Sequence, residues 1–432
     1  MKVRQVRATM NSKGFTLIEL VITMALVIVV IMITGSAFES ILKSSSRISS
    51  SEESNIEGVV GLEMFRHDLQ QMGFGMPTAF QSTAPVYIEA RYAPANSLND
   101  APSGIPRAVA SWESLTGGSD ASSESGNTYN VLSNTDYLAI KGTTVGRTKT
   151  SQKWAYLCYS SNGGKKPNTW SNSADNFSST DKVIVLSRTF SASGRVTNTM
   201  IYDTATPSTY WPSNPTVIMA DAFNPLQENP IHYLYGIHTA SLGMPFNRAD
   251  YFVARPSDTS KVPSTCATGT GILYKANVNH ADGKLTYYPL VDCVADMQVV
   301  FGWDLNGNGV IDESSAYNSD ATKISVSSSI ATTAATIKAI MESPDDIRTK
   351  LKYIKVYIMA QDGRKDMNYT NTNTLVGNTL ALVVGDPGIS GDPSNVSLTK
   401  GYTAAQLTTN GWQNYRWKIY RIVVRPKNLA SN

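Results

Sequence analysis

One segment near the start of the chain constrains the fold more than any other. Residues 15–33 hold a single charge, Glu19, and otherwise only apolar residues and two threonines. That length is close to the roughly 20 apolar residues that a helix needs to cross a bilayer. A charged side chain inside a bilayer is costly and normally has a partner or a function there. The segment therefore predicts a membrane helix with one functional carboxylate.

The charges around this segment predict its orientation. Four basic residues and no acid lie among residues 1–14 (Lys2, Arg4, Arg7 and Lys13). By the positive-inside rule, the N-terminus stays in the cytoplasm and the rest of the chain is exported. Without these four, 33 basic residues stand against 34 acidic ones, so nothing global favours nucleic acid as a partner.

The position of Gly14 is unusual for a signal sequence. A secretory signal peptide has its small-residue cleavage site after an apolar core of about 7–15 residues. Gly14 comes before the apolar run, so cleavage after it would keep the membrane helix. From residue 35 to residue 73 there is no proline, and apolar residues recur at spacings of three and four. This pattern predicts an amphipathic continuation of the helix, which Gly73 and Pro77 end.

The run GFTLIE at residues 14–19 resembles the class III signal of type IV pilins and type II secretion pseudopilins. The resemblance implies that prepilin peptidase cleaves between Gly14 and Phe15 and that Phe15 is then N-methylated. It also implies that Glu19 pairs with the terminal amine of a neighbouring subunit and sets the register of the filament core. Such a pair compensates a carboxylate in a low-dielectric core. A local alternative is a capping box formed by Thr16 and Glu19.

The remainder of the chain reads as a β-rich body. Short β-like runs alternate with turn-rich stretches, and residues 112–135 and 189–230 read as long loops. Ile354, Val356 and Ile358 share one face of a run at 352–359, which predicts a half-buried strand. The other predicted strands are residues 137–141, 154–159, 182–187, 231–237, 251–254, 271–274, 285–290, 297–303 and 415–424.

We therefore expect an α+β fold. A long N-terminal helix, with a membrane-spanning half and an amphipathic half, packs on a mostly antiparallel β-sheet body with long loop insertions. The expected segments are a leader at 1–14, a transmembrane half at 15–35, an amphipathic half at 36–76 and an exported body at 77–432. Within the body, residues 78–285 are an enlarged, loop-rich part and residues 286–432 are a family-like C-terminal part.

One loop has the spacing of a calcium ligand set. Asp304, Asn306 and Asn308 occupy positions 1, 3 and 5 of a calcium loop, the Val310 carbonyl position 7 and Asp312 position 9. Position 12 is a serine, so the loop is not an EF-hand. The expected affinity is that of extracellular modules, on the order of 10⁻⁴–10⁻³ M. The alternative is a metal-free turn, because the loop contains two Asn-Gly pairs.

The rest of the sequence contains few residues or motifs that indicate catalysis or binding. The three cysteines do not form a C-x-x-C pair, and in an exported body Cys266 and Cys293 could close a disulfide that leaves Cys158 free. The alternative is three buried thiols. The four histidines lie in no zinc motif, and no catalytic or phosphate-binding motif is present, so we do not expect an enzyme. The run 415–427 alternates Arg and Lys with aromatic residues, which we interpret as a sheet edge and not as a DNA-binding surface.

Residues 65–75, 290–303, 351–360 and 415–428 resemble PilW-type minor pilins, which are related to J-type pseudopilins. The resemblance implies a minor type IV pilin that primes pilus assembly at or near the filament tip. Its partners would be other minor pilins, the major pilin and the prepilin peptidase/N-methyltransferase. It would wait in the inner membrane, with its body in the periplasm, before joining the surface pilus. The alternatives are a J-like minor pseudopilin and a pilus-tip adhesin.

Overall fold

Helix α1 spans Leu17–Gln71, close to the predicted limits. Its last turns carry the predicted apolar face, and Phe65 and Leu69 are fully buried in the body. Val59 and Val60 belong to the same sequence pattern but are 58% and 60% exposed, so that part of the pattern is not a core face. Past the helix, Gly73 has a positive φ of 77°, a conformation that favours glycine and reverses the chain.

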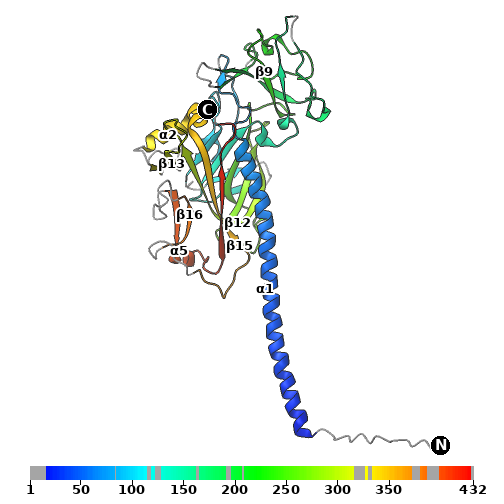
Figure 1. Ribbon diagram of the computed structural model, residues 1–432, viewed down its shortest axis with the longest axis vertical. Helices are drawn as coiled ribbons and strands as arrows, with labels where there is room; N and C mark the ends of the chain where they lie inside the picture. The colour runs from blue at the N-terminus through cyan, green and yellow to red at the C-terminus, as the bar shows by residue number, and fades with distance from the viewer. Residues whose placement is uncertain are drawn as a thin grey trace, which may run out of the picture. The chain divides into compact units, whose positions relative to one another are not determined.

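The computed structural model (Figure 1) describes residues 16–82, 84–113, 118–121, 128–161, 165–190, 196–206, 209–315, 326–328, 333–371, 380–386 and 398–429. Side chains are described for these residues except 39–57, 118–121, 313 and 326–328. Gly14 and Phe15 lie outside the described residues. The chain divides into two compact units, Met1–Glu53 and Ser54–Asn432.

Two sheets make up most of the body. The larger has 11 strands in the described part of the chain, with the order β14-β13-β12-β11-β10-β4-β3; β15 and β18 extend it from β12, and β5 and β2 from β10. Its neighbouring strands are antiparallel. The smaller has five strands in the order β1-β8-β7-β9-β6, and only β1 runs parallel to its neighbour. The α+β expectation, with a mostly antiparallel body, is confirmed.

The strands of the larger sheet are β2 (Val109–Trp112), β3 (Gly118–Ala121), β4 (Thr128–Val131), β5 (Tyr137–Gly142), β10 (Asn247–Pro256), β11 (Gly271–Val278), β12 (Leu285–Trp303), β13 (Glu313–Ser315), β14 (Val326–Ser328), β15 (Leu351–Asp362) and β18 (Arg416–Val424). Those of the smaller sheet are β1 (Ala79–Phe80), β6 (Trp154–Leu157), β7 (Lys182–Phe190), β8 (Val196–Ile201) and β9 (His232–His238). The hairpin β16 (Leu380–Gly385) and β17 (Thr399–Thr403) and the helices α2 (Ala334–Glu342), α3 (Pro344–Lys350) and α5 (Ala404–Thr409) complete the body.

Strand β15 corrects one sequence expectation. Ile354, Val356 and Ile358 are fully buried on one face, as the alternation predicts. The other face is buried as well, because Tyr357 and Met359 pack in a second hydrophobic cluster with side chains of β16, β17 and α5. In Figure 1, β16 and α5 lie beside the sheet that contains β12 and β15. The strand is therefore not half-buried.

Strand β8 forms inside the segment that the sequence pattern assigns to a loop. Its residues alternate poorly in hydropathy, so no local pattern marks it as a strand. It is held by antiparallel pairing with β7, in which Arg188 lies opposite Asn198 and Leu186 opposite Met200. Long-range hydrogen bonding therefore decides its conformation.

A buried carboxylate on α1 joins the end of the helix to the larger sheet. Asp68 is 1% exposed, and its Oδ2 atom accepts hydrogen bonds from the Lys275 ammonium and the Tyr251 hydroxyl. Its Oδ1 atom accepts one from Arg147 Nε at 2.8 Å. Phe65, one helical turn earlier, stacks on the Tyr251 ring with the ring centroids 3.9 Å apart. The helix is thus held by charge and by an aromatic contact.

A second buried network holds the segment before β2 against β5 and β10. Glu89 Oε2 lies 2.7 Å from Lys141 Nζ and 2.9 Å from Arg248 Nη1, and all three side chains are fully buried. Arg248 also pairs with Asp250 at 2.8 Å. Burial alone would raise the pKa of Glu89, but the Lys141 and Arg248 charges outweigh it and hold that pKa below its usual value. Glu89 is therefore ionised in the folded body.

Candidate functional site

The beginning of α1 is organised around Glu19. The Thr16 backbone N–H and hydroxyl donate to Glu19 Oε2 at 3.0 and 2.9 Å, and the Glu19 N–H donates back to Thr16 Oγ1 at 3.3 Å. This is a capping box, which satisfies backbone donors that the first turn would otherwise leave unpaired. Among the described residues, no basic side chain forms an ion pair with Glu19. The cap is compatible with a filament role, because Thr16 and Glu19 both lie beyond the expected cleavage position.

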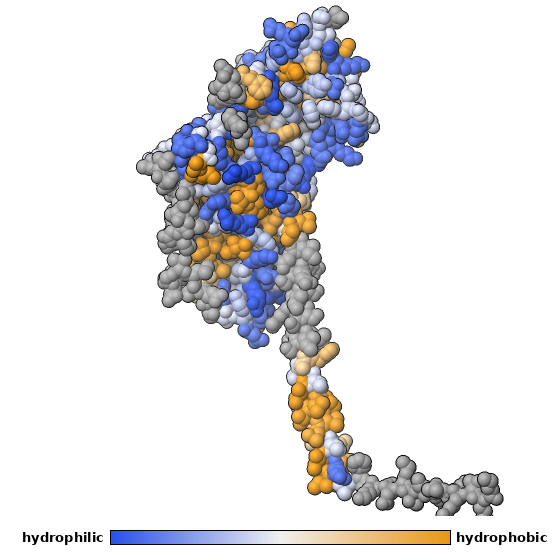
Figure 2. Space-filling view, in the orientation of Figure 1, coloured by the Kyte–Doolittle hydropathy of each residue, from blue (hydrophilic) through white to orange (hydrophobic). Residues whose placement is uncertain are grey.

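The helix that follows is apolar on all sides. Residues Leu17–Phe38 form a span long and apolar enough to cross a membrane, and the most apolar part of it is not buried within the chain. Figure 2 shows apolar side chains along this segment. Its threonines keep their hydroxyls inside the helix, since Thr23 donates to the Glu19 carbonyl at 2.9 Å and Thr34 to the Val30 carbonyl at 2.8 Å. No polar hydrogen of these threonines requires water.

The structure brings the five predicted calcium ligands into one tight loop between β12 and β13. Asp304 is 1% exposed, and its two carboxylate oxygens accept the Gly307 and Gly309 N–H groups at 2.7 and 2.9 Å. Asp312 is 6% exposed, and its Oδ2 atom accepts the Leu305 N–H at 3.0 Å. These bonds hold the loop closed by themselves, which is how a metal-free turn would be stabilised.

Side-chain oxygens that could bind a cation nevertheless lie close together in this loop. Asn306 Oδ1 and Asn308 Oδ1 each accept one backbone N–H, at 2.9 and 2.8 Å, and a carbonyl oxygen has a second lone pair. The Lys352 ammonium lies 3.4 Å from Asp304 Oδ2 and supplies a positive charge beside the loop. A cation would have to displace this ammonium, which is partly exposed and can move.

Cys266 and Cys293 form a disulfide, and Cys158 is a free thiol. The Cα atoms of the pair are 4.9 Å apart, and the bridge closes a separation of 27 residues between the turn before β11 and the middle of β12. Cys266 packs against the main hydrophobic cluster, while its chain neighbour Ala267 belongs to the second one.

The contacts of His238 and His280 are structural. His238 and His280 lie with ring centroids 5.4 Å apart, but among the described residues no group of three His, Cys, Asp or Glu side chains could hold a metal. The Asn247 amide donates to the carbonyls of Thr143 and Ile237, so its Oδ1 atom accepts from His280 Nε2 at 3.0 Å. His280 Nδ1 in turn accepts the Gly243 N–H at 3.3 Å. These contacts require a neutral ring.

We expect the body to lose stability between pH 7.5 and pH 5. Burial, aided by the neighbouring His238, lowers the pKa of His280 to about 3. Below the pKa of an unfolded histidine, His280 therefore binds a proton in the unfolded chain but not in the folded one. The free energy of unfolding that is present above that pKa is lost as the pH falls. His280 alone accounts for a loss of about 2 kcal/mol by pH 5. Urea titrations of the full chain in detergent at several pH values measure this. A flat profile would contradict the expectation.

Strand β18 carries the basic and aromatic residues of the closing run. In the described part of the chain it pairs with β15 alone, so it is an edge of the larger sheet. Lys418 and Arg421 lie over the rings of Tyr420 and Tyr357, respectively. Charged side chains on an edge strand discourage pairing with other chains.

Comparison with protein-family models finds the prokaryotic N-terminal methylation motif at residues 9–35. Comparisons with curated proteins and with solved structures found no match. The matched residues contain Gly14, Phe15, Glu19 and most of the apolar helix. The motif indicates a type IV pilin-like or pseudopilin-like precursor, and it implies processing by prepilin peptidase and assembly with other pilins. It indicates a structural subunit rather than an enzyme, with an apolar helix that fits an inner-membrane anchor before assembly.

Sequence reasoning missed a pair of arginines, Arg188 and Arg348, that face one cavity of the body. They are 160 positions apart in the chain and belong to β7 and α3. No local motif links them, so only the folded chain brings them to one place.

Proposed function

We propose that this protein is a minor type IV pilin of the PilW type that primes pilus assembly and stays at or near the filament tip. Cleavage between Gly14 and Phe15 leaves the membrane helix on the mature chain, with Phe15 N-methylated. Glu19 then pairs with the terminal amine of a neighbouring subunit. Its partners are other minor pilins and the major pilin, and the body moves from the periplasm to the cell surface.

The exposed apolar helix is the observation that carries this proposal. Its large side chains are between 48% and 83% exposed from Leu17 to Ile33. Burying one such side chain is worth about 2 kcal/mol, so the helix requires lipid or other apolar helices along its whole length. A bilayer meets that requirement before assembly, and the helices of neighbouring subunits meet it in a filament.

The mass of the N-terminal peptide from sheared surface filaments tests the proposal. We expect a peptide that begins at N-methylated Phe15. Detection of the chain only in membranes, and only with its leader, would contradict both the processing and the filament role. The same protein recovered only from a type II secretion pseudopilus would favour the J-like pseudopilin.

A tip adhesin is a second candidate, favoured by the smaller sheet. That sheet is built from the enlarged segment 78–285 and exposes Trp154 by 40% and Phe190 by 69%. Deleting the whole segment would also remove β5 and β10 of the larger sheet, so point substitutions are the better test. Loss of surface attachment by Trp154→Ser and Phe190→Ser bacteria that still make normal pili would support the adhesin.

We also propose that the loop from Asp304 to Asp312 binds calcium weakly. We expect 5 mM CaCl₂ to raise the unfolding free energy of the full chain by about 1–2 kcal/mol, since the expected dissociation constant is on the order of 0.1–1 mM. Differential scanning fluorimetry in detergent, with MgCl₂ as the control, measures the shift. Asp312→Asn retains an acceptor oxygen but loses the charge and should abolish the shift. An unchanged wild-type melting temperature in CaCl₂ and in EGTA would establish the metal-free turn.

A further inference from the structure

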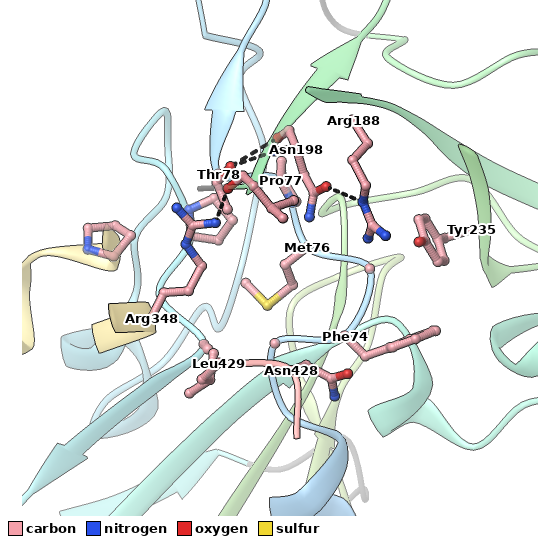
Figure 3. A pocket seen from close by; sticks show the side chains of 16 residues that line it. Phe74, Met76, Pro77, Thr78, Arg188, Asn198, Tyr235, Arg348, Asn428 and Leu429 are labelled. Carbon is pink, nitrogen blue, oxygen red and sulfur yellow. Dashed lines mark hydrogen bonds between the residues drawn. The ribbon is translucent and has the colours of Figure 1, made fainter. Parts of the chain in front are cut away.

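A cavity of about 380 Å³ lies between the smaller sheet and the segment that follows α1 (Figure 3). This volume is within the range of roughly 300–1,000 Å³ that small-molecule sites occupy. Its wall contains strands β7 and β8 on one side and α3 on another. The lining side chains that matter below are Arg188, Asn198, Arg348, Phe74, Met76 and Tyr235.

Among the residues that the structure describes, the cavity lining is positive and contains no acid. Two guanidinium groups, those of Arg188 and Arg348, face the cavity, while no Asp or Glu belongs to its lining residues. Arginine is the side chain that binds carboxylates and phosphates with the most favourable geometry. Two guanidinium groups around a cavity, of which Arg188 has no carboxylate partner among the described residues, therefore form an electrostatic site for an anion.

Arg188 uses only one of its hydrogen-bond donors within the described part of the chain. Its Nε atom donates to Asn198 Oδ1 at 3.1 Å, and its guanidinium lies 5.2 Å from the centroid of the Tyr233 ring. Among the described residues, no carboxylate pairs with it and neither Nη atom has a hydrogen-bond acceptor. Figure 3 shows these nitrogens turned toward the space between Met76 and Tyr235.

Arg348 is 9% exposed and incompletely satisfied. Its Nη1 atom donates to the Val196 carbonyl and its Nη2 atom to Asp345 at 3.0 Å, but its Nε atom is buried and has no partner. Burial lowers the pKa of this guanidinium. Asp345 is half-exposed and does not line the cavity, but it compensates the charge of Arg348, so the free positive charge of the lining is that of Arg188.

Arg248 in the same body shows what a purely structural arginine looks like. Its guanidinium is fully buried and hydrogen-bonded to both oxygens of Asp250, to Glu89 and to Asn99. Arg188 and Arg348, in contrast, each have hydrogen-bond donors without an acceptor among the described residues. Their free donors surround a space with an apolar floor, formed by Phe74, Met76 and Leu429.

We propose that this cavity binds a small organic carboxylate whose C–H face rests on Phe74 and Met76 and whose carboxylate meets the Arg188 guanidinium. Two sources of that chemistry fit: an acidic sugar, and the free carboxylate of a peptide end. The site is independent of the filament role, because its residues all belong to the body.

Isothermal titration of the full chain in detergent tests the site with matched pairs of probes. The first pair is sodium glucuronate and glucose, and the second is an N-acetylated leucine and its amide. We expect the charged member of one pair to bind at least about tenfold more tightly than the neutral one, because a charge-assisted hydrogen bond is lost. The pair that shows the difference identifies the source.

Variants assign the binding to the cavity. Arg188→Gln should remove the preference for the carboxylate, and Arg348→Lys should weaken it while keeping the charge of α3. Arg364→Gln is the control for net charge, since Arg364 is an exposed residue of a turn away from the lining. Equal binding of charged and neutral probes, no binding of either carboxylate to the folded chain, or a preference that survives Arg188→Gln would overturn the proposal.

Discussion

Replacing Asp68 by alanine is expected to destabilise the body by about 3–5 kcal/mol, because removing one partner of a buried ion pair leaves the other charge uncompensated. Lys275 would retain only the Val145 carbonyl, at 3.1 Å, as a partner in a side chain that is 3% exposed. Tyr251 would also lose the acceptor of its hydroxyl. Urea unfolding of the full chain in detergent, followed by tryptophan fluorescence, measures the loss.

The same helix offers a matched control. Glu63 pairs with Arg66 at 2.9 Å, but both side chains are largely exposed. Exposed pairs of this kind contribute less than about 1 kcal/mol, so Glu63→Ala should change little. If Asp68→Ala and Glu63→Ala lowered the free energy of unfolding equally, the burial of Asp68 would not determine how much it stabilises the body. The combination Asp68→Leu with Lys275→Met should recover part of the loss, because it removes two of the buried charges together.

Replacing Glu19 by valine is expected to reduce the share of this protein in sheared filaments by at least about tenfold, because an unpaired amine in an apolar core is penalised by more than 1.4 kcal/mol. The variant helix remains apolar, so membrane insertion should be retained. Quantitative mass spectrometry of filaments and of membranes measures incorporation and insertion separately. This expectation rests on the proposed pairing of Glu19 with the amine of a neighbour.

Thr23→Val is the control within the helix. Thr23 is polar, but its hydroxyl is satisfied by carbonyls of its own helix, so no partner in a neighbouring subunit depends on it. It should be incorporated as well as the wild-type chain. Normal incorporation of Glu19→Val would leave Glu19 with only its local role as the partner of Thr16 in the helix cap.

The apolar helix and half of the described strands could be predicted because their information is local. An apolar run and a 3.6-residue periodicity involve neighbours in the chain, and α1 begins and ends within a few residues of the predicted limits. Alternation in Ile354, Val356 and Ile358 likewise marks β15 correctly. The runs 285–290 and 297–303 both fall within one strand, β12, because pairing with β11 extends to Val294 and pairing with β15 begins at that residue.

By itself, the sequence determined the type IV pilin-like N-terminus and the long helix, since each depends on residues close together in the chain. It also indicated a β-rich body, but the pairing of those strands is long-range. Only the tertiary structure decided which buried charges meet. Asp68 finds Lys275 and Arg147, and Arg188 comes to face the same cavity as Arg348, across separations that no periodicity encodes. The physical reason is that burial and charge pairing depend on how distant segments pack around a common core. This packing cannot be inferred from the residues that flank each charge in the sequence.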